Sequence, residues 1–402
     1  MAPISIRVLL LAILFGACRG APRTDLDAGR LSALVDSLIP AVETAVGLPF
    51  RTAPVSALTT GEAVQAYLLD RIQRDFPNDR MEGITAAYRL FGLIPDSLDL
   101  KALLLAVYQE QVAGYYDPDT GILYAVEGSD PAQLRLILAH ELVHALQHQY
   151  LPLDSLMVLR GNGDVVAATQ AVLEGHATLA SIRVLAPSPE LLATEEFWDS
   201  YRQGVLAQQR NMPAFGQAPL VLREGLVFPY LAGAEFVRWW ETSRGRPLPE
   251  VAELPRSTEQ ILHPDRYDAD DRPVSVAFAD SSADLMYEDT LGELEVQIFL
   301  AQLRGADQVG YDAAVGWGGD RYRVYRTADG PALVWYSVWD GDAQSDRALN
   351  QLSRAGGRLT REGYRFAAEQ VAIEGRPGIR VRLAPPAWSG WAQAPRAQLR
   401  RP

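Results

Sequence analysis

The sequence has little cysteine, no clustered positive charge and no long apolar run. Cys18 is the only cysteine among the 402 residues, so no disulfide can form within one chain. The formal net charge is −13, and no sustained run of Lys and Arg occurs in the body of the chain, which argues against a nucleic-acid partner. The apolar stretch from Val8 to Ala17 has ten residues and is too short to cross a bilayer.

The N-terminus, residues 1–18, has the pattern of a targeting segment. Arg7 precedes the apolar stretch, as positive residues do in secretory signal peptides. The segment from Phe15 to Cys18 resembles a bacterial lipobox, which implies that Cys18 is the lipidated first residue of the mature protein. Ordinary signal-peptidase cleavage, with Cys18 discarded, is the alternative. Both predict export to the cell envelope, and the lipobox adds a membrane anchor on the periplasmic or extracellular face.

The length and the apolar periodicity predict an α+β protein with a large helical unit and a smaller appendage. We expect the large unit in residues 19–310, with its core in about 40–310. Apolar residues at helical spacing predict helices, and the Gly114 to Val126 segment with its central turn predicts a β-hairpin. The early helices are expected at Leu31–Ile39, Ala63–Ile72 and Asp99–Val112.

A small α+β region is expected in residues 311–385, because alternating apolar residues there indicate strands around one helix. Residues 386–402 are dominated by Pro, Ala, Gln and Arg and are predicted to be disordered. The aromatic stripe of Phe236, Trp239 and Trp240 is interpreted as core or interface and not as a cofactor-binding motif. Further helices are expected at Phe228–Trp240, Gly292–Leu303 and Asp342–Ala355, and strands at Tyr322–Arg326, Leu333–Trp339, Phe366–Ile373 and Ile379–Leu383.

Two histidines four residues apart carry the strongest chemical signal. Pro131, preceded by two capping residues, predicts a helix that continues to about Tyr150. Within it, His140 and His144 lie one turn apart on one face, so both rings can reach a single ion. Glu141 lies beside them and can take a proton from a zinc-bound water, whose pKa is lowered to about 7. The motif therefore supplies two zinc ligands and a general base.

A third ligand is required, and spacing narrows the choice. His148 lies eight residues from His140, about 12 Å along the same helix, which is too far for one ion. A second helix is predicted from about Asp164 to Ala186. Glu174 and His176 are about 200° apart around it, so only one of them can face the metal. His263 is a further candidate elsewhere in the chain.

The two segments together resemble the gluzincin clan of zinc metallopeptidases. The resemblance rests on Ala139 to Gln149 and on Ala171 to Ala180, and it implies that Glu174 completes a Zn²⁺ site with His140 and His144. It also implies zinc-dependent peptide-bond hydrolysis in a zincin-like domain, and a cleft-side hairpin that pairs with an extended peptide or protein substrate. Thr178 departs from the Asp that many gluzincins have there, although its hydroxyl could still brace a zinc-bound ring.

A second segment, Ser257 to Pro264 with Tyr267, offers a donor for the oxyanion that forms during hydrolysis. We predict His263 as a catalytic residue on this basis, with a purely structural His-Pro turn as the alternative. Three other functions stay open at this point. They are zinc-dependent hydrolysis of a non-peptide amide, a catalytically inactive envelope protein with structural zinc, and a binding module that contacts a partner through Trp317, Trp335 and Trp339.

Overall fold

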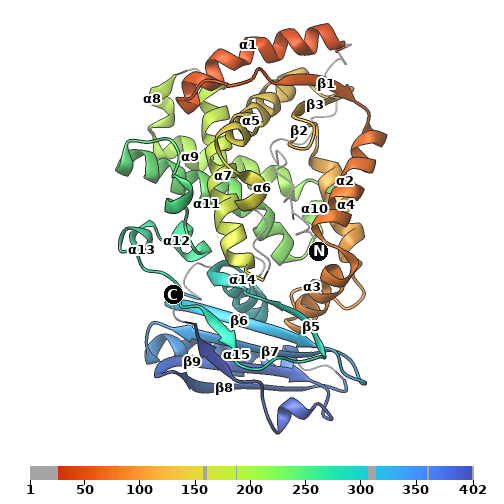
Figure 1. The fold of residues 1–402 in the computed structure, drawn as a ribbon, viewed down its shortest axis with the longest axis vertical. Helices are drawn as coiled ribbons and strands as arrows, with labels where there is room; N and C mark the ends of the chain where they lie inside the picture. Colours follow the sequence, from red (N-terminus) through yellow and green to blue (C-terminus); the bar gives the residue numbers. More distant parts are fainter. Residues whose placement is uncertain (1–25, 157–160, 187, 307–313, 360–361, 401–402) are drawn as a thin grey trace.

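The structure, a computed structural model, describes residues 26–156, 161–186, 188–306, 314–359 and 362–400 (Figure 1). The predicted targeting segment and Cys18 lie outside the described residues. Within the described ranges, no helix combines the length and the apolar character needed to cross a membrane. Helices dominate the first two thirds of the chain and a sheet dominates the last third, which confirms the α+β class.

The N-terminal unit is helical and contains one small sheet. The predicted hairpin is present as β2 and β3, and β1 pairs in parallel with β3, which gives the order β1-β3-β2. β2 is therefore an edge strand. The elements are α1 (Ala28–Val46), β1 (Val55–Thr59), α2 (Gly61–Asp75), α3 (Asn78–Leu90), α4 (Leu100–Gln111), β2 (Gly114–Asp117) and β3 (Ile122–Val126).

Three long helices form the centre of this unit, and Figure 1 shows α7 running through it between α5 and α11. α7 and α11 touch at two glycines, because a Cβ on Gly175 would lie 2.2 Å from the backbone of Gly233. The helices that surround them are short or peripheral. The bounds are α5 (Pro131–Tyr150), α6 (Leu153–Leu156), α7 (Gly163–Leu185), α8 (Pro189–Leu192), α9 (Glu195–Arg210), α10 (Pro213–Gly216), α11 (Leu220–Arg244), α12 (Thr258–Leu262) and α13 (Pro264–Asp268).

The C-terminal unit is a five-stranded antiparallel sheet in the order β5-β6-β7-β9-β8. Two helices, α14 and α15, pack against one face. The short pair β4 and β10 and the segment after β9 cover the other face. The bounds are β4 (Val276–Phe278), β5 (Leu285–Asp289), α14 (Gly292–Arg304), β6 (Trp317–Tyr325), β7 (Ala332–Trp339), α15 (Asp342–Leu359), β8 (Arg365–Ile373), β9 (Arg376–Ala384) and β10 (Ala397–Leu399).

Three sequence expectations about this unit need correction. The unit does not begin at residue 311, because β5 and α14 already belong to it. The segment expected to be disordered is ordered as far as residue 400, since β10 pairs with β4 and Trp391 packs on the sheet. The three tryptophans offered as a partner surface are at most 1% exposed and fill the core between sheet and helices. Trp317, Trp335 and Trp339 therefore cannot form a binding surface.

Candidate metal centre

The helix that carries His140 and His144 begins and ends where the sequence predicts. The Asp130 side chain accepts a hydrogen bond from the backbone N–H of Gln133 (3.3 Å), as an N-terminal cap does. Pro131 then occupies the first helical position, where no backbone N–H is needed. The regular helix that follows places the two histidine rings 4.7 Å apart, centroid to centroid. Both side chains are fully buried.

The helix that carries Glu174 is positioned by a cap and by a close helix crossing. Asn162 accepts a hydrogen bond from the backbone N–H of Val165 (3.2 Å) and starts α7. Gly175 follows Glu174 directly, and its missing side chain allows α7 to touch α11. The opposite side of this turn faces α5, so Glu174 points towards the two histidines. The sequence predicted the helix and the ligand, but not the crossing.

Three donor atoms converge between α5 and α7. His140 Nε2 lies 3.0 Å from His144 Nε2 and 3.1 Å from Glu174 Oε2, and His144 Nε2 lies 3.4 Å from the same oxygen. In the described part of the chain, these three side chains form the one group of three or more His, Cys, Asp or Glu residues whose ligand atoms lie within 4.8 Å of one another. This buried group could hold a metal ion. The structure thus brings together the three predicted ligands.

Gln147 organises the far side of this group and was not identified from the sequence. Its Oε1 accepts a hydrogen bond from His144 Nδ1 (2.9 Å), which leaves Nε2 of that ring directed at Glu174. Its Nε2 donates to the Leu173 carbonyl (2.9 Å) and lies 3.0 Å from Nδ1 of His176. A partner of this kind sets the tautomer and orientation of a metal-ligating histidine. A glutamine three residues after His144, on the same helix, was the available signal.

Glu141 occupies the position expected of a base beside the ligands. It is fully buried, and its Oε2 accepts a hydrogen bond from the backbone N–H of Tyr116 (2.8 Å). Tyr116 belongs to the edge strand β2, so the predicted hairpin lies against the candidate centre. The Tyr116 hydroxyl in turn lies 2.8 Å from Nδ1 of His148, which turns that histidine away from the ligand group.

Burial and the charges of neighbouring side chains shift the pKa values of the residues in this group. Burial lowers the pKa of His140 and would also lower that of His144, but the Glu174 carboxylate raises the His144 value to about 9. Burial would raise the pKa of Glu174, yet the nearby His144 and His140 lower it to about 2. His176, buried and close to these cationic groups, has its pKa lowered to about 3.

Two polar atoms at the centre have no hydrogen-bond partner in the described chain. They are Oε1 of Glu174 and Nδ1 of His140, both in fully buried side chains. The expected brace from Thr178 is absent, because its hydroxyl is itself without a partner and does not bond the His140 ring. Unpaired buried atoms of this kind are costly in a purely structural core. A metal ion bound by Glu174 could take up its free Oε1, whereas Nδ1 of His140 lies on the side of the ring away from the converging atoms.

The second predicted segment lies elsewhere. His263 bonds Glu293 on α14 through Nε2 (3.1 Å), and that hydrogen bond raises its pKa. Tyr267 packs against the predicted core aromatics Phe236, Trp239 and Trp240, and its hydroxyl donates to the Glu253 carbonyl (2.7 Å). Neither residue belongs to the ligand group, and the catalytic role of His263 stays a prediction. The aromatic ring beside His140 is that of Tyr230 on α11, at 6.1 Å between centroids.

Comparison with known proteins gives one match, in the C-terminal unit. Residues 283–384 match the model of a family described as a domain of unknown function (DUF8575). The matched residues run from β5 to the end of β9 and contain none of the candidate metal ligands. No curated protein and no solved structure matches the chain. The family boundary agrees with the structural one, since both place β5 and α14 with the sheet.

Proposed function

We propose that this chain is a zinc-dependent hydrolase of peptide bonds in the cell envelope. The observation that carries the proposal is the convergence of His140, His144 and Glu174 with a carboxylate, Glu141, on the turn between the two histidines. Three ligands leave one position of a tetrahedral zinc for water or substrate, as in catalytic sites. The gluzincin resemblance of the two segments supports the same assignment.

The donor set fits zinc better than harder cations. Two imidazoles and one carboxylate are the ligand types of catalytic zinc, whereas Mg²⁺ and Ca²⁺ prefer oxygen ligands. A tetrahedral ion with bonds of about 2.0 to 2.2 Å needs donor atoms about 3.3 to 3.6 Å apart. The three separations here are 3.0, 3.1 and 3.4 Å. A small outward movement of the side chains is sufficient to admit the ion.

The residues around the site have separable roles in hydrolysis. Bound zinc would lower the pKa of a water and polarise the scissile carbonyl. Glu141 would accept a proton from the attacking water on a carboxylate oxygen and then deliver it to the leaving amine. Gln147 would hold the His144 ring with Nδ1 protonated, so that Nε2 stays free to bind metal.

Two neighbours are suited to hold a substrate. β2 is an edge strand, and its Tyr116 N–H already points at Glu141, so an extended peptide added along this edge would pass the base. Tyr230 is the hydroxyl-bearing aromatic residue beside His140, and we propose it as an oxyanion donor in addition to the predicted His263. Both assignments depend on the hydrolase proposal.

The test combines zinc analysis with cleavage assays on protein that lacks residues 1–18. We expect one zinc per chain in wild type, none in Glu174→Ala, and retained zinc in Glu141→Gln with cleavage of a peptide library lowered about a hundredfold or more. Glu62→Gln, an exposed substitution of the same kind on α2, is the control and should behave as wild type. Zinc binding without cleavage of any peptide, but with cleavage of non-peptide amides, would redirect the proposal to those substrates.

A structural metal site is the second candidate, and burial favours it. The side chains of His140, Glu141, His144 and Glu174 are each 0% exposed, so a substrate reaches them only after a movement of the chain. A structural zinc has four protein ligands, so Glu141, which lies outside the group of three, would have to move to become the fourth. Glu141→Gln separates the two candidates. Loss of zinc in this variant supports a structural site, and retention of zinc with loss of cleavage supports the hydrolase.

A further inference from the structure

A cavity of about 640 Å³ lies between α9 and α11, away from the metal ligands. The residues of each helix that line it recur at helical spacing, so one face of each helix is directed at the cavity. α12 and α14 close the cavity, and none of the metal ligands lines it. Its volume is in the range of about 300 to 1,000 Å³ that is typical of small-molecule sites.

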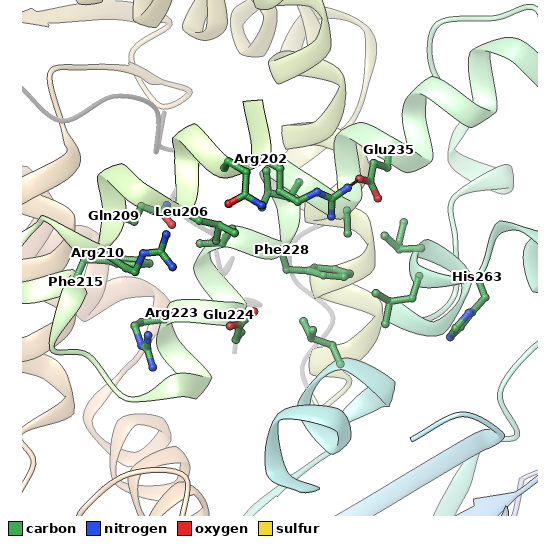
Figure 2. A pocket seen from close by; sticks show the side chains of 17 residues that line it. Arg202, Leu206, Gln209, Arg210, Phe215, Arg223, Glu224, Phe228, Glu235 and His263 are labelled. Carbon is green, nitrogen blue, oxygen red and sulfur yellow. Dashed lines mark ion pairs between the residues drawn. The ribbon is translucent and has the colours of Figure 1, made fainter. Parts of the chain in front are cut away.

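One end of the cavity is lined by polar side chains that have few or no hydrogen-bond partners. The Gln209 side chain is 4% exposed, yet neither its Oε1 nor its Nε2 has a hydrogen-bond partner. Arg210 forms no ion pair or hydrogen bond with the described chain, and Arg223 uses only Nε, which donates to the Ala218 carbonyl (3.1 Å). Figure 2 shows Gln209, Arg210 and Arg223 on the same side of Phe228. A buried amide without a partner is costly unless a ligand completes its hydrogen bonds.

Apart from the exposed Gln203, the remaining side chains of the cavity are apolar or already paired. Leu206, Phe228 and the side chains around them form an apolar middle section. At the other end Arg202 pairs with Glu235, so this arginine is already neutralised. His263, which also lines the cavity, is occupied by its bond to Glu293. Among the buried polar side chains that line the cavity, the one whose polar atoms lack partners is therefore Gln209.

We propose that this cavity binds a carboxylate attached to an apolar group. Two guanidinium groups at the polar end face one carboxyl, Glu224, whose pKa is raised by burial and lowered by Arg223. The balance of positive charge matches a monoanion better than a dianion. Arg210 and Arg223 would bind the carboxylate, Gln209 would bind it or an adjacent amide, and the apolar part would lie along Phe228. A peptide ending in an apolar residue and a fatty acid share this chemistry.

The test is calorimetric titration of zinc-loaded Glu141→Gln protein, which keeps peptide ligands intact. The peptide arm compares N-acetyl-Ala-Phe with its C-terminal amide, and the fatty-acid arm compares decanoate with decanol. We expect an acid in one arm to bind at least about tenfold more tightly than its neutral analogue. The arm that binds identifies the source of the carboxylate. If neither acid binds at millimolar concentration, or if acid and neutral forms bind equally, the proposal fails.

Two variants and a control place the ligand in this cavity. Arg210→Ala should weaken binding about tenfold, because it removes one charged contact from an exposed side chain. Gln209→Leu should also weaken binding, while the unliganded protein melts at the same temperature or higher because a buried unpaired amide has been removed. Arg354→Ala, an exposed substitution on α15, should leave binding unchanged. Unaltered affinity in both cavity variants would overturn the assignment. Because zinc content and cleavage are measured separately, this failure would leave the hydrolase proposal intact.

Discussion

Each unit of the molecule contains a fully enclosed carboxylate, but the two differ in their hydrogen-bond partners. In the C-terminal unit, Asp320 accepts the backbone N–H groups of Leu291 and Gly292 (3.0 Å each) and the Trp335 indole N–H (2.9 Å). At the candidate metal centre, Glu174 meets only histidine nitrogens, and its Oε1 has no partner. Asp320 caps the start of α14, where the helix dipole also favours an anion.

The pKa values reflect the same difference. Burial raises the pKa of Asp320 to about 6, although its three hydrogen bonds oppose the rise. The pKa of Glu174 is lowered to about 2 by cationic neighbours that overcome burial. Asp320, whose oxygens accept several hydrogen bonds, therefore holds its neighbouring elements together, whereas Glu174 keeps one oxygen available for a ligand.

Replacing each of the two acids by alanine, in separate variants, should give the largest of the predicted effects. Glu174→Ala removes one of three ligands and should weaken zinc binding more than about a hundredfold, with the sheet intact. Asp320→Ala leaves two backbone N–H groups and an indole N–H unpaired, so the free energy of unfolding should fall by about 3 kcal/mol or more while the folded protein still binds zinc. Zinc titration and urea unfolding measure the two quantities. Equal loss of zinc in both variants would contradict the distinction.

Removal of the metal should affect one unit much more than the other. A ligand present at a thousand times its Kd stabilises the folded state by about 4 kcal/mol. After treatment with a chelator, amide hydrogen exchange should accelerate in α5 and α7 and change little in β6 and β7. Added zinc should restore protection. Uniform acceleration across both units would show that metal and sheet stability are not separable.

Substitution of Gln147 tests whether its hydrogen bonds to the ligand His144 and to Leu173 contribute to zinc affinity. Gln147→Leu keeps the size of the side chain but removes the hydrogen bond to His144 and the bond to the Leu173 carbonyl. Zinc affinity should fall by about ten- to a hundredfold, as for other partners of metal-ligating histidines. Competition with a chromophoric chelator measures the affinity. Gln149→Leu, two residues away, instead removes hydrogen bonds to the backbone of Arg51 and Thr52, and it is a control in which zinc affinity should not change.

The stability of the protein should depend on pH through the buried, hydrogen-bonded acids Asp164 and Asp320. This effect should be the smallest of the four predicted in this section. Burial raises the pKa of Asp164 to about 7 and that of Asp320 to about 6. The folded state therefore holds these protons more tightly than the unfolded state, and the stability they contribute at low pH is lost as pH rises from about 4 to about 7. Urea midpoints measured without zinc should fall over this range. In Asp164→Asn the fall should be shallower, and an unchanged slope would remove Asp164 from the explanation.

Features that depend on interactions between residues close in the chain could be predicted from the sequence. α5 and α7 were predicted closely, because caps, prolines and apolar spacing act within a few residues. The ligands were predicted because His140 and His144 lie one turn apart, and because a familiar pattern surrounds Glu174. The same local reasoning could not identify the partner of His263, because Glu293 lies thirty residues away in the chain.

Long-range packing explains the other differences between expectation and structure. Trp391 looked like part of a polar tail, but it packs on a sheet whose strands begin far upstream. Gln209 lies in α9, a helix that the sequence analysis did not predict, and the approach of α11 encloses it beside the cavity. Neither feature has a local signature. Composition and periodicity describe what one segment can bury, but not which other segment will cover it.

The glycine crossing of α7 and α11 has a consequence for finding relatives of this protein. A Cβ at Gly175 would lie 2.2 Å from the Gly233 backbone, and one at Gly233 would lie 2.1 Å from the Ala171 carbonyl oxygen. A chain with larger residues there must separate the two helices, which would carry Tyr230 away from His140. A glycine directly after the ligand glutamate, together with a second glycine inside a later aromatic helix, is thus a readable mark of this arrangement. A homologue could be recognised by it even where the sheet domain has been lost.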